Sequence, residues 1–218
     1  DCIHPIHLGA VFEERIRNYR MRGITAKVDL GLSAPIEFDS RLEQPFQYTV
    51  IGGTLDDIQK SFDAVKYGRV ATRPSLEVHL PPAGGANNGY QVASVLVHFA
   101  ADEPLQSQSK ADQSGIKEKI LMGCLNRLEE YIPRIKELVV QTNVMTPQDL
   151  KSRYGCKGGH RYHGEMSLDQ LLVRPVPEAN GYRTPFEGLY LAGQGCHPGG
   201  GLTLAPGFYG AREALEAM

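Results

Sequence analysis

One segment near the C-terminal end, residues 188–201, limits what this chain can fold into more than any other. It reads Gly-Leu-Tyr-Leu-Ala-Gly-Gln-Gly-Cys-His-Pro-Gly-Gly-Gly. A short apolar run enters this glycine-rich turn, and a stretch with helical character, residues 202–218, leaves it. A strand, a glycine turn and a helix in this order expose backbone N–H groups at the start of the helix. The pattern therefore predicts a place where a phosphate or another anion binds.

The same segment is not a complete dinucleotide-binding unit. Gly193 and Gly195 give the first half of a G-x-G-x-x-G pattern, but position 198 is proline. A complete unit also needs a second strand and an acidic residue about 20 positions further on. An ordinary glycine-rich connection is the competing interpretation, and the spacing alone does not choose between the two. The three glycines at 199–201 favour close approach of a ligand to the backbone, because a purely structural turn seldom bears their entropic cost.

Composition narrows the class of protein. The chain has 218 residues, of which 41% are apolar, as is typical of a globular protein with a hydrophobic core. Its net charge of −2 predicts no nucleic-acid partner. The four cysteines, Cys2, Cys124, Cys156 and Cys196, are too far apart to resemble a disulfide scaffold. We therefore expect reduced thiols and a cytoplasmic protein.

Hydrophobic periodicity predicts four or five strands interleaved with helices, mostly before residue 174. The expected strands are 24–32, 46–52, 75–80, 90–100 and 138–145. The expected helices are 9–20, 55–67 and 110–131, with short ones after Thr146 and after the capping box at Ser167. This order indicates an α+β fold with a mixed β-sheet flanked by helices.

Three of these elements carry expectations about burial. The inner face of the predicted helix 110–131 is expected to carry Ile116, Ile120, Cys124, Leu128 and Ile132. Leu55, Ile58, Phe62 and Val65 are spaced as the buried stripe of the second helix. The consecutive apolar residues 95–97 indicate a central strand that is covered on both faces.

Prolines at 175, 177 and 185 exclude regular structure over residues 174–186. We therefore expect an α+β domain over 1–174, a proline-rich bridge over 175–187 and a strand–turn–helix over 188–218. Because a lone strand leaves its backbone groups unpaired, residues 189–192 must join the main sheet or pair with something outside this chain.

Histidine, cysteine and glutamate residues suggest two further sites. His163 and Glu165 are weak catalytic candidates, because a histidine that titrates near neutral pH can be oriented by a carboxylate. A structural role, in which both side chains hold a loop, is the favoured alternative. A zinc site would have to combine Cys156, His160, His163, Cys196 and His197. Their spacing matches no familiar zinc motif, so we expect no metal.

The most specific residues of the chain resemble a known family. Gly188–Pro206 (GLYLAGQGCHPGGGLTLAP), preceded by His163–Gln170 (HGEMSLDQ) and Arg174–Pro177 (RPVP), resembles the C-terminal end of phytoene desaturase-like, or phytoene dehydrogenase-related, FAD-dependent oxidoreductases. The likeness extends back to Asn18–Gly23 (NYRMRG), so it is expected over essentially the whole chain.

The resemblance implies an incomplete cofactor site. Members of the family are much longer and begin with a G-x-G-x-x-G unit that holds the ADP half of FAD. This chain lacks that glycine unit. Residues 1–174 then correspond to the substrate-side domain, and 188–218 to the last strand and helix of the Rossmann-like FAD-binding domain. The resemblance implies that the cofactor-binding residues of this chain are Gly193, Gln194, His197, Pro198, Gly199, Gly200, Gly201 and Leu202. The first two would face the pyrophosphate or ribityl chain, and the others the flavin ring. Many flavoproteins carry an acid where this chain has Gln194, so that contact differs here.

The resemblance also implies hydride removal from a small apolar substrate by the flavin, with the missing N-terminal part as the main partner. A homodimer through exposed apolar surface and peripheral membrane contact follow from family analogy only. The leading hypothesis is thus a C-terminal fragment of an FAD-dependent oxidoreductase that is inactive alone. The alternatives are a freestanding binding or interaction module and a zinc-dependent hydrolase that uses Cys156, His160 and His163.

Overall fold

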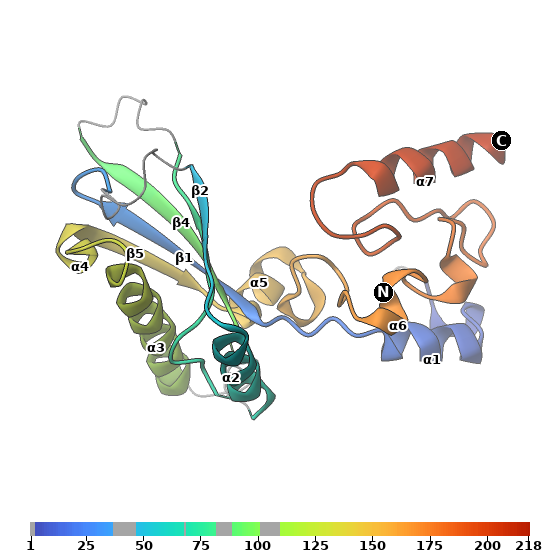
Figure 1. Cartoon of the computed structure of the whole chain (residues 1–218). Helices are drawn as coiled ribbons and strands as arrows, with labels where there is room; N and C mark the ends of the chain where they lie inside the picture. The colour runs from blue at the N-terminus through green and yellow to red at the C-terminus, as the bar shows by residue number, and fades with distance from the viewer. Residues whose placement is uncertain (1–2, 37–46, 68, 82–88, 101–109) are drawn as a thin grey trace. The chain divides into compact units, whose positions relative to one another are not determined.

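The computed structural model describes residues 3–36, 47–67, 69–81, 89–100 and 110–218 (Figure 1). The chain forms two compact units. The sheet unit is Gly23–Gly159, and the terminal unit combines Asp1–Arg22 with His160–Met218. This division follows compactness alone. The functional boundaries expected at residues 174 and 187 therefore stay a prediction.

The sheet unit is built on a five-stranded sheet of order β2-β3-β4-β1-β5. Its strands are β1 (Thr25–Leu32), β2 (Tyr48–Ile51), β3 (Leu76–His79), β4 (Gln91–His98) and β5 (Val139–Met145). With the helices beside it, the sheet confirms the α+β class and each of the five predicted strands.

All four neighbouring pairs of strands are antiparallel, so the expectation of a mixed sheet is wrong. The pair β2 and β3, which a helix joins, shows the reason. Ile51 at the end of β2 lies opposite Leu76 at the start of β3. The helical connection therefore leaves and re-enters the sheet at the same end, which gives an antiparallel pair instead of a parallel crossover.

One face of the sheet carries the core. Side chains alternate strictly between buried and half-buried along β1, so Ala26, Val28, Leu30 and Leu32 point to the same face. Helix α3 (Lys110–Glu129) lies along that face (Figure 1). Its predicted inner residues are all buried there: Ile116, Ile120, Cys124, Leu128 and, just beyond the helix, Ile132. Strand β4 is central as expected, but Val92 on the opposite face is exposed, so β4 is covered on one face only.

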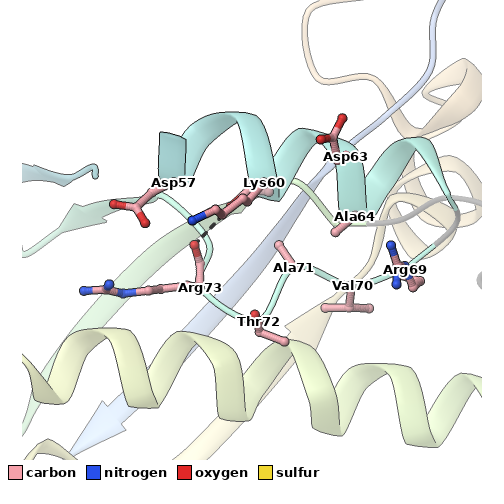
Figure 2. A pocket seen from close by; sticks show the side chains of 10 residues that line it. Asp57, Lys60, Asp63, Ala64, Arg69, Val70, Ala71, Thr72 and Arg73 are labelled. Atoms are coloured by element: carbon pink, nitrogen blue, oxygen red, sulfur yellow. Dashed lines mark hydrogen bonds between the residues drawn. The ribbon is translucent and has the colours of Figure 1, made fainter. Parts of the chain in front are cut away.

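Helix α2 (Leu55–Lys66) forms where the sequence predicts it, but its apolar stripe is not buried. Leu55 is 85% exposed, and Ile58 and Phe62 are also exposed. The buried residue of α2 is Ser61, whose hydroxyl donates a hydrogen bond to the carbonyl of Arg73 at 3.1 Å. Residues 69–73 run between α2 and α3 (Figure 2), and the core on the sheet face contains buried residues of α3 but none of α2.

Side-chain caps fix two helix starts in the sheet unit. Thr54 before α2 and Thr146 before α5 (Pro147–Tyr154) each form a reciprocal capping box with an aspartate three residues later. A short helix, α4 (Ile135–Leu138), precedes β5. Ser167 is the N-cap residue of the short helix that the sequence predicts after it, but the predicted capping box is wrong, because the Ser167 hydroxyl accepts a hydrogen bond from Arg20 and does not bind the helix backbone.

The terminal unit contains α1 (Ala10–Asn18), α6 (Leu168–Leu171) and α7 (Ala205–Glu216). Residues 189–192 do not form a strand of the five-stranded sheet. The expectation that they join this sheet or pair outside the chain is wrong, because they pair with residues 182–184: Tyr190 bridges Arg183, and the N–H of Leu191 donates to the carbonyl of Tyr182 at 2.8 Å. The segment packs on α7, since a Cβ added to Gly210 would lie 2.5 Å from the carbonyl oxygen of Leu191. Within the described residues, no helix combines the length and the apolar character needed to cross a membrane.

Two leucines test the corrected burial of the helices. Leu128 of α3 is 1% exposed, whereas Leu55 of α2 is 85% exposed. We expect Leu128→Ala to lower the free energy of unfolding by about 2–5 kcal/mol, because it leaves a cavity in the core. Leu55→Ala should change it by less than about 0.5 kcal/mol. Urea unfolding followed by circular dichroism measures both, and equal losses would contradict the placement of α2.

Candidate functional site

The glycine turn before α7 leaves a row of backbone donors free. Gly199, Gly200 and Gly201 all have left-handed backbone angles, with φ of 67°, 57° and 70°. Within the part of the chain that the structure describes, the N–H groups of residues 199–204 donate no hydrogen bond. Gln194 fixes the turn from the side, because its amide nitrogen donates to the carbonyl of Gly201 at 3.0 Å. The turn thus presents unsatisfied donors next to a helix start.

The start of α7, like the turn before it, favours negatively charged groups. Its N-cap residue, Leu204, provides no side-chain cap, and its first turn contains no acidic residue. The hydroxyl of Thr203 accepts a hydrogen bond from the N–H of Ala205 at 3.4 Å. Uncapped N–H groups and the helix dipole together give this end a partial positive charge. The turn and the helix start therefore both favour an anionic or electron-rich ligand.

Arg174 lies beneath the turn and is fully buried. Its guanidinium donates to carbonyl oxygens of Gly164 at 3.1 Å, Glu165 at 3.1 Å and Gln170 at 3.3 Å, and it also contacts the sulfur of Met166. The ring of Tyr19 lies 6.0 Å away in a cation–π arrangement. These contacts fix the guanidinium and hold residues 164–170 around it.

The charge of Arg174 has no counter-charge close by. Among the described residues no carboxylate lies within ion-pair distance of it, and its Nε atom has no hydrogen-bond partner. That nitrogen faces the turn, since a Cβ added to Gly199 would lie 2.9 Å from it. Burying a cation without a counter-ion costs several kcal/mol, which carbonyl dipoles offset only in part. An unpaired positive charge is thus held directly under the glycine turn.

The predicted cofactor-binding residues lie together on this turn. Leu202 is strongly exposed, and the added-Cβ positions of Gly193 and Gly201 have nothing within 4 Å. His197 is exposed too, and its carbonyl accepts a hydrogen bond from the hydroxyl of Tyr182 at 2.6 Å. The geometry gives these residues open space in front of free N–H groups. Their role as cofactor contacts stays a prediction.

His163 and Glu165 do not form the expected acid–base pair among the described contacts. The carboxylate of Glu165 binds Arg22 at 2.7 and 2.8 Å and lies 3.5 Å from Arg20. These hydrogen bonds from Arg22 hold the pKa of Glu165 below its ordinary value. A carboxylate so engaged is a poor base at neutral pH. The catalytic role of the two residues stays a prediction with no support from their contacts.

The residues of the hypothetical zinc site make other contacts. The Nδ1 atom of His160 accepts hydrogen bonds from the backbone of Tyr162 and Gly164, both at 3.3 Å. Burial lowers the pKa of His160 and raises the pKa of the Cys196 thiol. Over the described ranges no three histidine, cysteine or acidic side chains gather as metal ligands. Cys124, Cys156 and Cys196 are free thiols, and Cys2 lies outside the described residues.

A hollow of about 580 Å³ lies between α2 and residues 69–73 of the sheet unit (Figure 2). Its lining includes Asp57, Lys60, Asp63, Arg69 and Arg73. Several of these charges already serve the fold: Asp57 caps α2, and Arg73 binds Glu130 at 2.7 Å. None of the predicted site residues lines this hollow, so we place the candidate site at the glycine turn.

The residues at the turn fit a bound FAD. The fit rests on the orphaned, buried Nε of Arg174 and on glycines whose added Cβ atoms would enter open space. It rests also on backbone donors that have no acceptor among the described residues and that suit the oxygen-rich parts of a flavin nucleotide.

The chain is similar in sequence to part of several proteins that are named as oxidoreductases or desaturases. No protein-family model matches it. It is 35% identical over 158 residues to rat pyridine nucleotide-disulfide oxidoreductase domain-containing protein 2, and 33% identical over 154 residues to the mouse protein of that name. It is 25% identical over 158 residues to the phytoene desaturase (neurosporene-forming) of Cereibacter sphaeroides. The resemblance to phytoene desaturase-like oxidoreductases is therefore confirmed.

The alignments also define how far the likeness extends. Each covers 69% of this chain, less than the whole-chain likeness expected from the motifs. The chain spans about a quarter of the length of the two mammalian relatives, 26% in each case, and 28% of the bacterial desaturase.

The lowered pKa of Glu165 predicts a pH-dependent contribution to stability. A carboxylate with a lowered folded-state pKa stabilises the fold above its unfolded pKa, and this contribution is lost as the pH falls through the folded value. We expect Glu165→Gln to cost about 1 kcal/mol at pH 7, because half-exposed pairs are screened by solvent. The cost should shrink as the pH falls from the ordinary value of 4.5 toward 2.

Urea unfolding of both proteins at several pH values makes this measurement. Glu137→Gln is the control, because Glu137 also pairs with an arginine but is well exposed. A cost for Glu165→Gln that stays constant down to pH 2 would show that the ion pairs with Arg22 and Arg20 do not stabilise the unit.

Proposed function

We propose that this chain is the C-terminal portion of an FAD-dependent oxidoreductase and that it does not catalyse a reaction alone. The proposal is carried by one observation: an open glycine turn with free N–H groups, above a buried and unpaired arginine. The oxidoreductase relatives support the reaction class. When bound, FAD would supply the redox chemistry by accepting a hydride from the substrate.

The residues of the chain hold and orient the cofactor in this proposal. The backbone at Gly193 and Gln194 faces the pyrophosphate or ribityl chain, and residues 197–202 face the flavin ring. Gln194 keeps the turn in place through its hydrogen bond to Gly201. Because Gln194 is neutral, it donates an amide N–H where an acid would accept a hydrogen bond.

The substrate surface is proposed on the open face of the sheet. That face carries Tyr48 and Val50 of β2 and Val92 of β4, all of them exposed. It also carries Asp29 of β1, which accepts hydrogen bonds from Ser94 at 2.8 Å and Asn143 at 3.3 Å. An apolar substrate would lie on the side of β2, where exposed apolar side chains gather.

A second surface fits the missing part of the protein. Leu204, Phe208 and Leu215 are exposed and follow one side of α7, at spacings of four and seven residues. Three large apolar side chains in a row form a surface that soluble proteins normally cover. We propose that the N-terminal dinucleotide-binding part of the longer protein packs against this stripe. The competing occupant of the stripe is a second copy of the chain. The competing function is that of a freestanding binding or interaction module.

Flavin content tests the cofactor proposal. We expect the 218-residue chain to purify without flavin absorbance and the longer protein to retain FAD. In the longer protein, Gly201→Ala should reduce flavin content at least several-fold, because its Cβ would enter the space in front of the turn. Gly181→Ala is a matched control: Gly181 also has a positive φ and open space around it, but lies outside the turn. Stoichiometric FAD in the isolated chain would reject the proposal.

The exposed stripe of α7 is tested by co-purification. We expect the separately expressed dinucleotide-binding part to bind this chain, and Phe208→Asp to abolish the complex because a charge cannot be buried in an apolar contact. Leu172→Asp is the control, since Leu172 of the same unit is 68% exposed and Phe208 is 65% exposed. Light scattering of the chain alone measures its oligomeric state and so tests whether a second copy covers the stripe. A dimer that Phe208→Asp dissociates would assign the stripe to self-association.

A further inference from the structure

We propose that Arg174 is a positioning residue for the glycine turn, and that its buried charge makes the turn select ligand groups with negatively charged oxygens. This inference rests on the proposed function where it names FAD as the source of such groups. Sequence reasoning gave Arg174 no role. The assignment comes from its place between two glycines and from its missing partner.

The glycine at position 199 leaves room for the guanidinium. A Cβ added to Gly199 would lie 2.9 Å from Nε of Arg174. A Cβ added to Gly164 would lie 2.8 Å from Nη2, but it would meet the hydroxyl oxygen of Tyr19 first, at 1.9 Å. Real Cβ atoms essentially never come so close to a neighbour. The guanidinium therefore packs directly on the backbone of the turn at Gly199.

The charge acts through the turn and does not touch the ligand. Arg174 has no exposed surface, so a ligand meets the backbone of Gly199 first. Within the described part of the chain, the guanidinium of Arg174 interacts with carbonyl oxygens, with the sulfur of Met166 and with the hydroxyl of Tyr19, and none of these groups carries a negative charge at neutral pH. Its positive charge therefore remains uncompensated beneath N–H groups of the same polarity. Such a site repels cations and binds anions.

Two parts of FAD offer the required chemistry. The pyrophosphate carries negatively charged oxygens in every state, and the pyrimidine edge of the flavin gains electron density when the flavin is reduced. A charge beneath residues 197–202 would favour either group. Two experiments distinguish these sources.

The first experiment uses the 218-residue chain and inorganic pyrophosphate, followed by calorimetry at low ionic strength. We expect Arg174→Met to weaken pyrophosphate binding at least tenfold and Arg174→Lys to restore a part of it, because the lysine keeps the charge. Arg212→Met is the control: it removes an exposed charge from α7 of the same unit, and it should change binding less than twofold. Gly199→Ala keeps the charge but displaces the arginine, so it should also weaken binding. This variant keeps the test decisive if Arg174→Met does not fold.

The second experiment uses the longer protein with FAD bound and measures the midpoint potential. If the charge acts on the flavin ring, Arg174→Met should make the reduced form about tenfold less favoured, which is about 30 mV for a two-electron couple. A change in pyrophosphate binding alone assigns the charge to the phosphates, and a change in potential alone assigns it to the ring.

The inference is overturned if the folded Arg174→Met variant, or Gly199→Ala in its place, binds pyrophosphate like the wild type and keeps the potential of the wild type. If the longer protein binds no FAD, the proposed function fails, and the pyrophosphate measurement still decides the role of Arg174.

Discussion

The terminal unit depends on one interaction, the burial of the Arg174 guanidinium among backbone carbonyls. It ties residues 164–170 together and supports the turn through Gly199. A buried charge whose hydrogen bonds are broken leaves unsatisfied groups that cost about 1–3 kcal/mol each. The unit therefore has a strong reason to keep this geometry. The same geometry leaves the turn with free N–H groups and an uncompensated positive charge.

The sheet unit is stabilised in a different way. Its core is the apolar face of an antiparallel sheet packed on α3, with the strict alternation of β1 at its centre. An antiparallel sheet can be covered on one face and open on the other. This one is open where Tyr48, Val50 and Val92 are exposed. A surface for a ligand is thus available without any loss of core packing.

Much of the fold was predictable from local sequence patterns. Particular residues of α3 and α2 show which features such patterns predict and which they do not. The period of α3 predicts Ile120, Cys124 and Leu128 as buried, and the threonine at 146 predicts a capped helix start; both are confirmed. Periodicity shows that α2 is amphipathic but not which element covers it. Its apolar side is exposed because α3 already occupies the sheet face.

The candidate site was predictable only in part, for the same reason. The glycine turn is contiguous in sequence, so its residues could be named from the pattern. The partner of Glu165 could not, because Arg22 lies 143 residues away along the chain and His163 is its neighbour in sequence. Arg174 was missed because an arginine beside prolines normally indicates an exposed linker. The one sequence signal for its position is Gly199, which makes room for the guanidinium but lies 25 residues further along the chain.

Two neighbouring surfaces of the terminal unit, the glycine turn and the α7 stripe, favour different kinds of partner. The turn at 199–202 offers N–H groups that no acceptor among the described residues takes, and the α7 stripe offers exposed apolar side chains. A second copy of this chain supplies apolar cover from its own α7, but its turn again presents donors and not acceptors. A nucleotide held by another protein part supplies both the acceptors and the apolar contact. The coexistence of the two surfaces is therefore a stronger argument for a shared flavin site than either surface alone.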